Sequence, residues 1–287
     1  MIVRSVTIAA ALAAARRQLA DSPTAALDSR LLMEAATGLD HAGLIGAGRE
    51  PLQEGAAHRF AGLLARRSSG EPMAYILGRQ EFYGRDFRTA PGVLIPRPET
   101  EMLVDAALEL EPKPRSILDL GTGSGCLLLT ALAELDGARG LGIDICDDAL
   151  AIAAANRAAL GLDERAKLRR LGFSDAASAL APTHFDLVLA NPPYIREGTE
   201  LPRSVAAFEP AAALFAGADG LDAHRQVARV IASRLAPSGS AFVEIGHDQG
   251  QSASEVYAAA LPHRSVGTHR DAARQARMVA VGPERCL

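Results

Sequence analysis

The sequence contains few cysteines, and their spacing argues against two common uses of this residue. Cys126, Cys146 and Cys286 match neither a metal-binding knuckle nor a disulfide framework. We therefore interpret them as reduced thiols of a cytoplasmic protein, and we expect no metal site.

Long hydrophobic runs are also lacking. The longest nearly apolar stretch covers residues 6–15 and is too short to span a bilayer, which needs about 20 residues. It follows Arg4, as the core of a signal peptide would, but alanine is only weakly apolar, and Arg16, Arg17 and Gln18 continue a helical pattern. We expect neither a transmembrane helix nor a membrane partner.

The chain has little surplus charge and few aromatic residues. Its 30 Lys and Arg residues against 34 Asp and Glu residues give a formal net charge of −4, so no basic excess is available to neutralise phosphates. Together with an aromatic content of 4%, this charge disfavours direct binding of nucleic acid. The content of hydrophobic residues, 48%, is typical of a soluble globular protein. The length of 287 residues predicts one large domain or two ordinary ones.

Residues 1–78 have the pattern of a small helical bundle. Thr7 can cap a first helix, a second follows Pro23 and ends at Gly38, and a third starts at Pro51. The sequence leaves open whether this N-terminal domain docks a substrate or only stabilises the rest of the chain.

Residues 79–98 change character. Two aromatic-rich runs, 81–83 and 86–88, flank Gly84 and Arg85. This pattern indicates a β-hairpin, which we interpret as a linker between two domains.

Strands and helices alternate over residues 99–287. Such alternation predicts an α/β fold with a doubly wound, mostly parallel sheet and helices on both of its faces. Two runs near the end, 263–268 and 278–281, are expected to form an antiparallel edge. The other predicted strands are 116–120, 140–145, 167–171, 185–190 and 241–245, and predicted helices start at Ser124, at Asp147 and near Asp219.

The first of these strands runs into a glycine-rich loop. The residues from the strand end onward that can contact a ligand are Asp119, Gly121, Thr122, Gly123, Ser124 and Gly125. Glycines permit positive φ and close approach of a ligand, and the helix start offers free N–H groups. The G-x-G-x-G spacing lacks the third glycine of a dinucleotide fingerprint and the lysine of a P-loop, so pyrophosphate binding is disfavoured. A tight turn without a ligand is the alternative.

Asp144 ends the second strand, where a carboxylate can accept both ribose hydroxyls of an adenosine ligand. Capping of the next helix is an alternative role, but Asp147 is better placed for it. Together with the loop, Asp144 indicates an adenosine cofactor without a pyrophosphate. S-adenosylmethionine fits, with S-adenosylhomocysteine as the product, because its sulfonium needs no phosphate cradle and Asp119 can orient its ammonium group.

The most specific segment is Asn191-Pro192-Pro193-Tyr194, at the carboxyl end of strand 185–190. Pro192 restricts Asn191 to an extended backbone, and the two prolines supply carbonyls without N–H donors. An amide or aromatic amine donates two hydrogens, which the Asn191 side-chain oxygen and the Pro192 carbonyl can accept, while Tyr194 offers an apolar face. We therefore predict that these four residues bind the substrate and carry catalysis, with about 7–11 kcal/mol available from orientation alone. A turn without a ligand is the alternative.

Together these motifs resemble the family of protein glutamine methyltransferases that modify peptide-chain release factors. The resemblance runs from about residue 70 to residue 280 and includes residues 70–72, 94–101, 119–125, 191–195, 208–210, 244–246 and 249–250. It implies a Rossmann-like class I methyltransferase domain over residues 99–287. It also implies methyl transfer to the glutamine amide in the Gly-Gly-Gln loop of class I release factors, with the N-terminal domain helping to hold that protein.

Two positions depart from the family pattern. Where the family has an acidic residue followed by an aromatic one, this chain has Gly172 and Phe173. The resemblance therefore assigns no contact to the adenine amino group, and it implies only that Phe173 covers the face of the adenine ring. Near the end, Arg274 replaces the glycine of an Asp-x-x-Gly-x-x-Arg pattern. We expect this replacement to alter only a surface loop.

Three other functions are weighed against this one. A methyltransferase acting on a ribosomal-protein glutamine would share the Asn-Pro-Pro-Tyr chemistry. A DNA adenine methyltransferase can bind a flipped base in the same segment. Such an enzyme needs a basic region that recognises DNA, and a net charge of −4 argues against one. A silent scaffold has no physical need for the loop glycines, both aspartates and Asn191 together. The sequence does not assign roles to Arg97 and Glu99 or name the preferred release factor, and a monomer is favoured.

Overall fold

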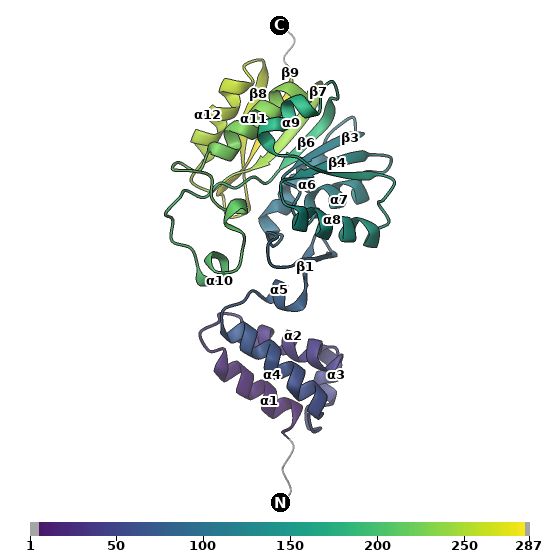
Figure 1. The fold of residues 1–287 in the computed structure, drawn as a ribbon, viewed down its shortest axis with the longest axis vertical. Helices are drawn as coiled ribbons and strands as arrows, with labels where there is room; N and C mark the ends of the chain where they lie inside the picture. Colours follow the sequence, from purple (N-terminus) through teal and green to yellow (C-terminus); the bar gives the residue numbers. More distant parts are fainter. Residues whose placement is uncertain (1–5, 285–287) are drawn as a thin grey trace, which may run out of the picture. The chain divides into compact units, whose positions relative to one another are not determined.

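The structure is a computed structural model that describes residues 6–284 (Figure 1). The chain divides into two compact units. The first contains the chain up to Gly78 together with Pro202–Phe208, and the second contains Arg79–Leu201 and the chain from Glu209 onward. Among the described residues, no helix is both long and apolar enough to cross a membrane.

The first unit is helical, as the sequence predicts. The side chain of Thr7 accepts a hydrogen bond from the Ala10 amide and so caps the first helix. The third and fifth helices are not predicted, because 6 and 5 residues are too few to show a clear period. The helices are α1 (Ile8–Gln18), α2 (Ala25–Thr37), α3 (His41–Gly46), α4 (Glu54–Ser68) and α5 (Met73–Leu77).

Apolar packing and one charged cluster hold this unit together. Leu32 and Met33 of α2 are fully buried, and Phe60 of α4 packs in the same core. At one end, Nε of Arg67 donates to Oδ2 of the buried Asp28 at 2.8 Å. A charged pair this well buried needs each partner, because removing one leaves the other charge without compensation.

Pro202–Phe208 belongs to the first unit although it lies far along the sequence. It contains the one-turn helix α10 (Arg203–Ala206). A Cβ atom built on Gly70 would lie 3.9 Å from both Arg203 and Phe208, so this segment packs beside the end of α4. No local sequence signal marks such an excursion, because it is defined by tertiary contacts alone.

The second unit begins with the hairpin of β1 (Arg79–Phe82) and β2 (Arg85–Arg88). The sequence predicts a turn at Gly84 and Arg85, but the turn residues are Tyr83 and Gly84, with φ of 53° and 73°. Two positive φ values match the twist of the paired strands. Tyr83 tolerates this conformation because its amide and hydroxyl donate to Glu101 and Asp105 of α6 (Glu101–Leu108).

The hairpin is part of the second unit's core. Phe82 and Phe87 are fully buried, and their rings meet edge to face with centroids 6.0 Å apart. Both pack with residues of α6 and of the central sheet. Residues 79–88 therefore belong to the body of this unit.

A seven-stranded sheet forms the centre of the second unit, in the order β5-β4-β3-β6-β7-β9-β8. The strands from β5 to β7 are parallel, and β9 pairs antiparallel with β7 and with β8. This mostly parallel sheet with an antiparallel edge confirms the predicted fold class. The strands are β3 (Ser116–Leu120), β4 (Arg139–Asp144), β5 (Ala166–Arg170), β6 (Phe185–Ala190), β7 (Leu235–Glu244), β8 (Arg264–Arg270) and β9 (Ala276–Glu284).

Most strand bounds agree with the prediction to within two residues, but β7 begins at Leu235 instead of residue 241. Pro237 and Gly239 give this stretch the sequence pattern of a loop. In the structure, a Cβ at position 239 would lie 2.9 Å from the Asp186 carbonyl oxygen. The glycine therefore marks a close approach of β7 to β6, as glycine in a strand often does.

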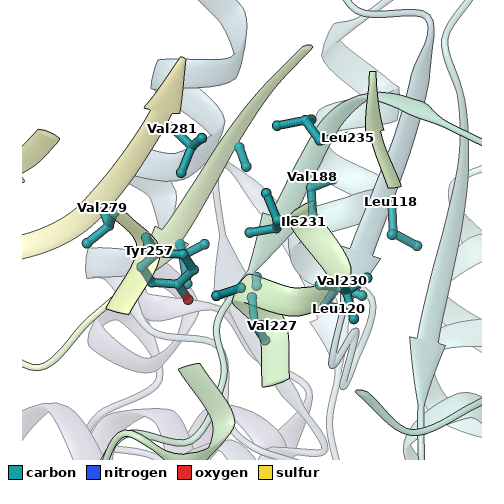
Figure 2. Close-up of a cluster of buried hydrophobic side chains, with 14 of the residues drawn as sticks. Leu118, Leu120, Val188, Val227, Val230, Ile231, Leu235, Tyr257, Val279 and Val281 are labelled. Carbon is teal, nitrogen blue, oxygen red and sulfur yellow. The ribbon is translucent and has the colours of Figure 1, made fainter. Parts of the chain in front are cut away.

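Helices cover both faces of the sheet (Figure 1). Successive strand residues point to opposite faces, so Ile117 packs with the first group of helices and Leu118 with the second. Figure 2 shows the second core, where Val188, Ile231 and Tyr257 gather. The first group is α6, α7 (Cys126–Glu134) and α8 (Asp147–Ala159), and the second is α9 (Phe173–Ala179), α11 (Asp222–Arg234) and α12 (Gly250–Ala260).

Candidate active site

A cavity of about 610 Å³ lies at the carboxyl ends of β3, β4 and β6. This is the edge where ligands bind in open α/β sheets. Residues 92–97 and parts of 210–217 complete its walls. The cavity brings together most of the predicted site residues: Asp119, Gly121, Thr122, Gly123, Ser124, Asp144, Phe173, Asn191 and Pro193.

The loop after β3 has the backbone that its glycines allow. Gly121, Gly123 and Gly125 have φ values of 75°, 54° and 81°. A Cβ on Gly121 would lie 3.2 Å from the Phe173 ring, so bare backbone is needed beside the cavity. A Cβ on Gly125 would lie 2.9 Å from Leu129, so this glycine serves packing of α7, and it does not line the cavity.

Asp144 connects the loop to the end of β4. Its Oδ2 accepts the Gly123 N–H and its Oδ1 accepts the Cys146 N–H, both at 2.9 Å. The bond to Cys146, the N-cap of α8, is close to the capping role named above as an alternative. Each carboxylate oxygen has a further lone pair, so Asp144 can still accept ribose hydroxyls from the cavity side.

Asp119 is buried, with 1% of its surface exposed. Burial raises the pKa of its carboxyl to about 7; the Thr122 hydroxyl, which donates to Oδ2 at 2.6 Å, lowers it, and the charge of Asp144 adds to the rise. A buried carboxylate is stabilised by a cation beside it, because the cation replaces lost hydration. Asp119 is therefore well placed for an ammonium group.

Two apolar side chains line the cavity near Asp144. Phe173, at the start of α9, was predicted, but Ile145 was missed. Ile145 directly follows the acidic strand end and is 59% exposed, and that sequence position was the available signal. An exposed isoleucine on a cavity wall offers an apolar surface to a flat ligand such as adenine.

Asn191 is held by a buried hydrogen-bond network that sequence reasoning also missed. Its Nδ2 donates to Oγ1 of Thr100 at 3.1 Å, and that hydroxyl donates to Oε2 of Glu244 at 2.5 Å. Burial raises the pKa of the Glu244 carboxyl to about 7, while the bond from Thr100 lowers it. Residues 94–101 and 244–246 carry the family resemblance, but their sequence positions gave no sign of this contact.

The other members of Asn-Pro-Pro-Tyr have different surroundings. Pro193 lines the cavity, whereas Pro192 and Tyr194 are not among the described residues of the wall. The Tyr194 hydroxyl lies 3.5 Å from Oε1 of Glu244, and its carbonyl accepts a hydrogen bond from Gln249 at 2.9 Å. Tyr194 is thus anchored at both its side chain and its backbone.

The cavity wall has acidic and apolar character. Arg97 is the one cation among the described lining residues, and its Nη2 donates to Oε1 of the buried Glu209 at 2.5 Å. The same carboxylate accepts the Ile95 amide at 3.2 Å, so Arg97 braces this wall. With its charge paired, no cationic cradle for a phosphate is left among these residues. Bare glycines, two aspartates and apolar walls fit S-adenosylmethionine instead.

Cys126 and Cys146 are free thiols, while Cys286 lies outside the described residues. Burial raises the pKa of Cys126 to about 12, so its thiol stays protonated. Within residues 6–284, no cluster of His, Cys, Asp or Glu side chains could hold a metal ion.

The sheet is mostly parallel, and three motifs lie at the carboxyl ends of its strands: a glycine loop after β3, an aspartate at the end of β4 and Asn-Pro-Pro-Tyr after β6. This combination defines an S-adenosylmethionine-dependent methyltransferase. Family models agree with this class. Residues 97–218 match the methyltransferase small domain, and residues 10–78 match the PrmC N-terminal domain.

Known relatives identify the family within that class. The release factor glutamine methyltransferase of Cereibacter sphaeroides is 45% identical over 84% of this chain and 86% of its own. That of Bradyrhizobium diazoefficiens is 42% identical over 86% of this chain and 84% of its own. The chain therefore belongs to the release factor glutamine methyltransferase family, as its motifs indicate.

Among solved structures, the release-factor-specific protein-(glutamine-N5) methyltransferase of Alicyclobacillus acidocaldarius is similar. It is 24% identical, covers 69% of this chain and all of its own (100%), and has a TM-score of 0.43. Family membership rests on the sequence relatives.

Proposed function

We propose that this chain transfers a methyl group from S-adenosylmethionine to the side-chain amide nitrogen of the glutamine in the Gly-Gly-Gln motif of a class I release factor. The observation that carries the proposal is a pair of acceptors that directly follow the end of β6, one of which, Asn191, lines the cavity. The Oδ1 atom of Asn191 and the carbonyl of Pro192 accept no hydrogen bond within residues 6–284. A primary amide has two N–H donors to fill such a pair.

These acceptors serve the reaction by orientation. When both amide hydrogens are bound in the plane of the amide, the nitrogen can present one face to the methyl group. When bound, S-adenosylmethionine supplies that methyl group on a positively charged sulfur. Holding the two partners in line contributes up to about 7–11 kcal/mol without prior removal of a proton. Asn191, Pro192, Pro193 and Tyr194 form the substrate side of the site.

The cofactor side follows from the cavity lining. Asp144 accepts the ribose hydroxyls, Asp119 orients the ammonium group, and Phe173 covers the adenine. The backbone of residues 121–125 approaches the ligand closely, because glycine side chains leave it bare. These assignments explain why the loop, the strand ends and Asn191 surround one cavity.

The helical unit is proposed to hold the release factor. A glutamine on a folded protein needs more contact area than the Asn-Pro-Pro-Tyr pocket offers, because specific protein pairs bury about 1,200–2,000 Å². The described residues that line the cavity all belong to the second unit. The helical unit exposes large apolar side chains, among them Ile45 at 71%.

Label transfer tests this function. Purified protein is incubated with methyl-labelled S-adenosylmethionine and, in separate reactions, a release factor, a ribosomal-protein mixture and duplex DNA. We expect label in the release factor alone, and none in a release factor whose Gly-Gly-Gln glutamine is replaced by alanine. Label in ribosomal proteins only would support the second candidate substrate. Label in none of them would contradict the proposal.

A further inference from the structure

The proposed function requires one of two possible orientations of the Asn191 amide. An asparagine side chain has an acceptor oxygen and a donor NH₂ group on the two sides of a nearly symmetric amide. Only the oxygen can accept a hydrogen from a substrate NH₂ group. A rotation of about 180° at the end of the side chain would turn the Asn191 NH₂ group toward the substrate NH₂ group, and the substrate amide would lose one of its two orienting hydrogen bonds.

Thr100 and Glu244 distinguish these orientations. Above the raised Glu244 pKa of about 7 the carboxylate is ionised and only accepts hydrogen bonds, so at those pH values the single hydroxyl hydrogen of Thr100 is directed to Oε2, 2.5 Å away. The Thr100 oxygen then has only lone pairs for Asn191. Its partner at 3.1 Å must therefore be the NH₂ group of Asn191, which leaves Oδ1 for the cavity.

Burial of Thr100 and Glu244 favours this orientation of the Asn191 amide over the flipped one. Thr100 and Glu244 are 3% and 2% exposed, so water cannot readily take the place of either partner. A flipped Asn191 would set its oxygen against the Thr100 oxygen with no hydrogen between them, and unpaired buried polar groups are unfavourable. Glu244 is not among the described residues of the cavity wall, and its short contact toward Asn191 runs through Thr100.

We propose that Thr100, directed by Glu244, is a positioning residue that keeps the Asn191 side-chain oxygen facing the substrate amide. This inference rests on the proposed function for its kinetic test, but its structural content can be measured without any substrate. Thr100→Val and Thr100→Ser provide a matched pair. Valine keeps the shape without the hydroxyl, and serine keeps the hydroxyl without the methyl group.

In the kinetic test, we expect Thr100→Val to lower kcat with a release factor by about 10²-fold, because a misplaced acceptor at the reacting group costs on that order. S-adenosylmethionine affinity should stay unchanged. Thr100→Ser should restore kcat to within about fivefold of the wild type, since it loses only one buried methyl group. A wild-type kcat in Thr100→Val, or an equal loss in both variants, would overturn the proposal.

A double-mutant cycle separates positioning from general structural damage. If Thr100 acts only through Asn191, then Thr100→Val should cause no further loss of kcat in an Asn191→Ala background. A further loss of about 10²-fold, as large as in the wild-type background, would show that Thr100 acts in another way and would overturn the proposal.

A measurement on the substrate-free protein keeps the two proposals distinguishable. The Asn191 side-chain NH₂ signals are identified in NMR spectra by their disappearance in Asn191→Ala. In the wild type, the hydrogen bound to Thr100 should exchange with solvent about tenfold more slowly than in Thr100→Val. Unprotected NH₂ hydrogens in the wild type would overturn the inference even if Thr100→Val failed to fold. Protected hydrogens in an enzyme that methylates no release factor would overturn the proposed function alone.

Discussion

Asp144 binds the glycine-rich loop directly: its Oδ2 accepts a hydrogen bond from the Gly123 backbone N–H at 2.9 Å. One carboxylate thus both shapes the loop after β3 and faces the cavity. A substitution at Asp144 should therefore affect the cofactor twice, by removing acceptors for the ribose and by loosening the backbone beside it.

We predict that Asp144→Ala weakens S-adenosylmethionine binding by at least about 10²-fold, because two charge-assisted hydrogen bonds contribute about 1.5–3 kcal/mol each. Isothermal titration calorimetry measures the effect, and circular dichroism checks that the fold persists. Asp136→Ala is a matched control, because Asp136 is exposed in the loop that precedes β4 and does not line the cavity. Equal affinity in the two variants would contradict the ribose assignment.

Ile45 tests the proposed role of the helical unit. We predict that Ile45→Asp lowers kcat/KM for an intact release factor by about tenfold through KM, because a charge opposes burial of this exposed side chain in a protein interface. Cofactor affinity should not change. Ala61→Asp, on an exposed position of α4, is the matched control. If both variants methylate the release factor like the wild type, Ile45 lies outside the docking surface.

Arg274 adopts a left-handed backbone conformation, with φ of 61°, in the turn between β8 and β9. The family pattern has glycine here, and the expected surface loop is confirmed, since Arg274 is exposed. We predict that Arg274→Gly stabilises the protein by about 0.5–1 kcal/mol, because a left-handed conformation costs a non-glycine residue about 1–2 kcal/mol, partly offset by glycine's larger backbone entropy.

Urea unfolding measures this gain. Ala273→Gly serves as the control, because among the described non-glycine residues only Tyr83 and Arg274 have positive φ. The control should be neutral or destabilising. A loss of stability in Arg274→Gly would mean that the arginine side chain contributes more than its backbone strain costs.

His224 gives the protein a pH-dependent stability. It is fully buried, its Nδ1 lies 3.0 Å from the Tyr257 hydroxyl, and its Nε2 has no hydrogen-bond partner in the described part of the chain. Burial lowers its pKa from 6.5 to about 4. Between these values the unfolded chain binds the proton and the folded chain does not. Stability that is present above pH 6.5 is therefore lost as the pH falls toward 4.

We expect this loss to reach about 3 kcal/mol in the wild type and to be missing in His224→Asn, whose amide can still bond Tyr257 but cannot be protonated in this range. The measurement is the difference in unfolding free energy between the two proteins at a series of pH values. The raised pKa values of Asp119 and Glu244 affect both proteins alike and cancel in the difference. A difference independent of pH would contradict the account.

Much of the fold could be predicted because its signals are local. Strand 185–190 is indicated by a short run of apolar residues, and the glycine-rich loop by the spacing of its glycines, so each can be predicted from a few consecutive residues. The turn at Tyr83 was misplaced by one residue because a tyrosine with positive φ is held by Glu101, a contact from outside the hairpin. Likewise, no local pattern indicates that residues 202–208 join the helical unit.

Sequence motifs predicted residues that line the cavity, but not the buried residues that hold those side chains in place. Many residues that line the cavity occupy strand ends and loops with recognisable motifs, so the sequence analysis could name Asp119, Asp144 and Asn191 as candidates. The buried residues could not be named, because Thr100 and Glu244 are 144 positions apart and meet only when η1 (Pro98–Thr100) packs beside the end of β7. Hydrogen-bond partners at such separations are set by tertiary structure, which a single sequence does not display.

The central claim is that Asn191 accepts a hydrogen bond from the glutamine that is methylated. It is tested most directly by turnover of wild type and Asn191→Ala on an intact release factor, with the methyl group located by peptide mass spectrometry and cofactor affinity measured in parallel. We predict methylation at the Gly-Gly-Gln glutamine by the wild type, a loss of about 10²–10³-fold in kcat in Asn191→Ala, and a much smaller change in affinity for S-adenosylmethionine. Near-wild-type turnover in Asn191→Ala, or a methyl group on any other residue, would contradict the account.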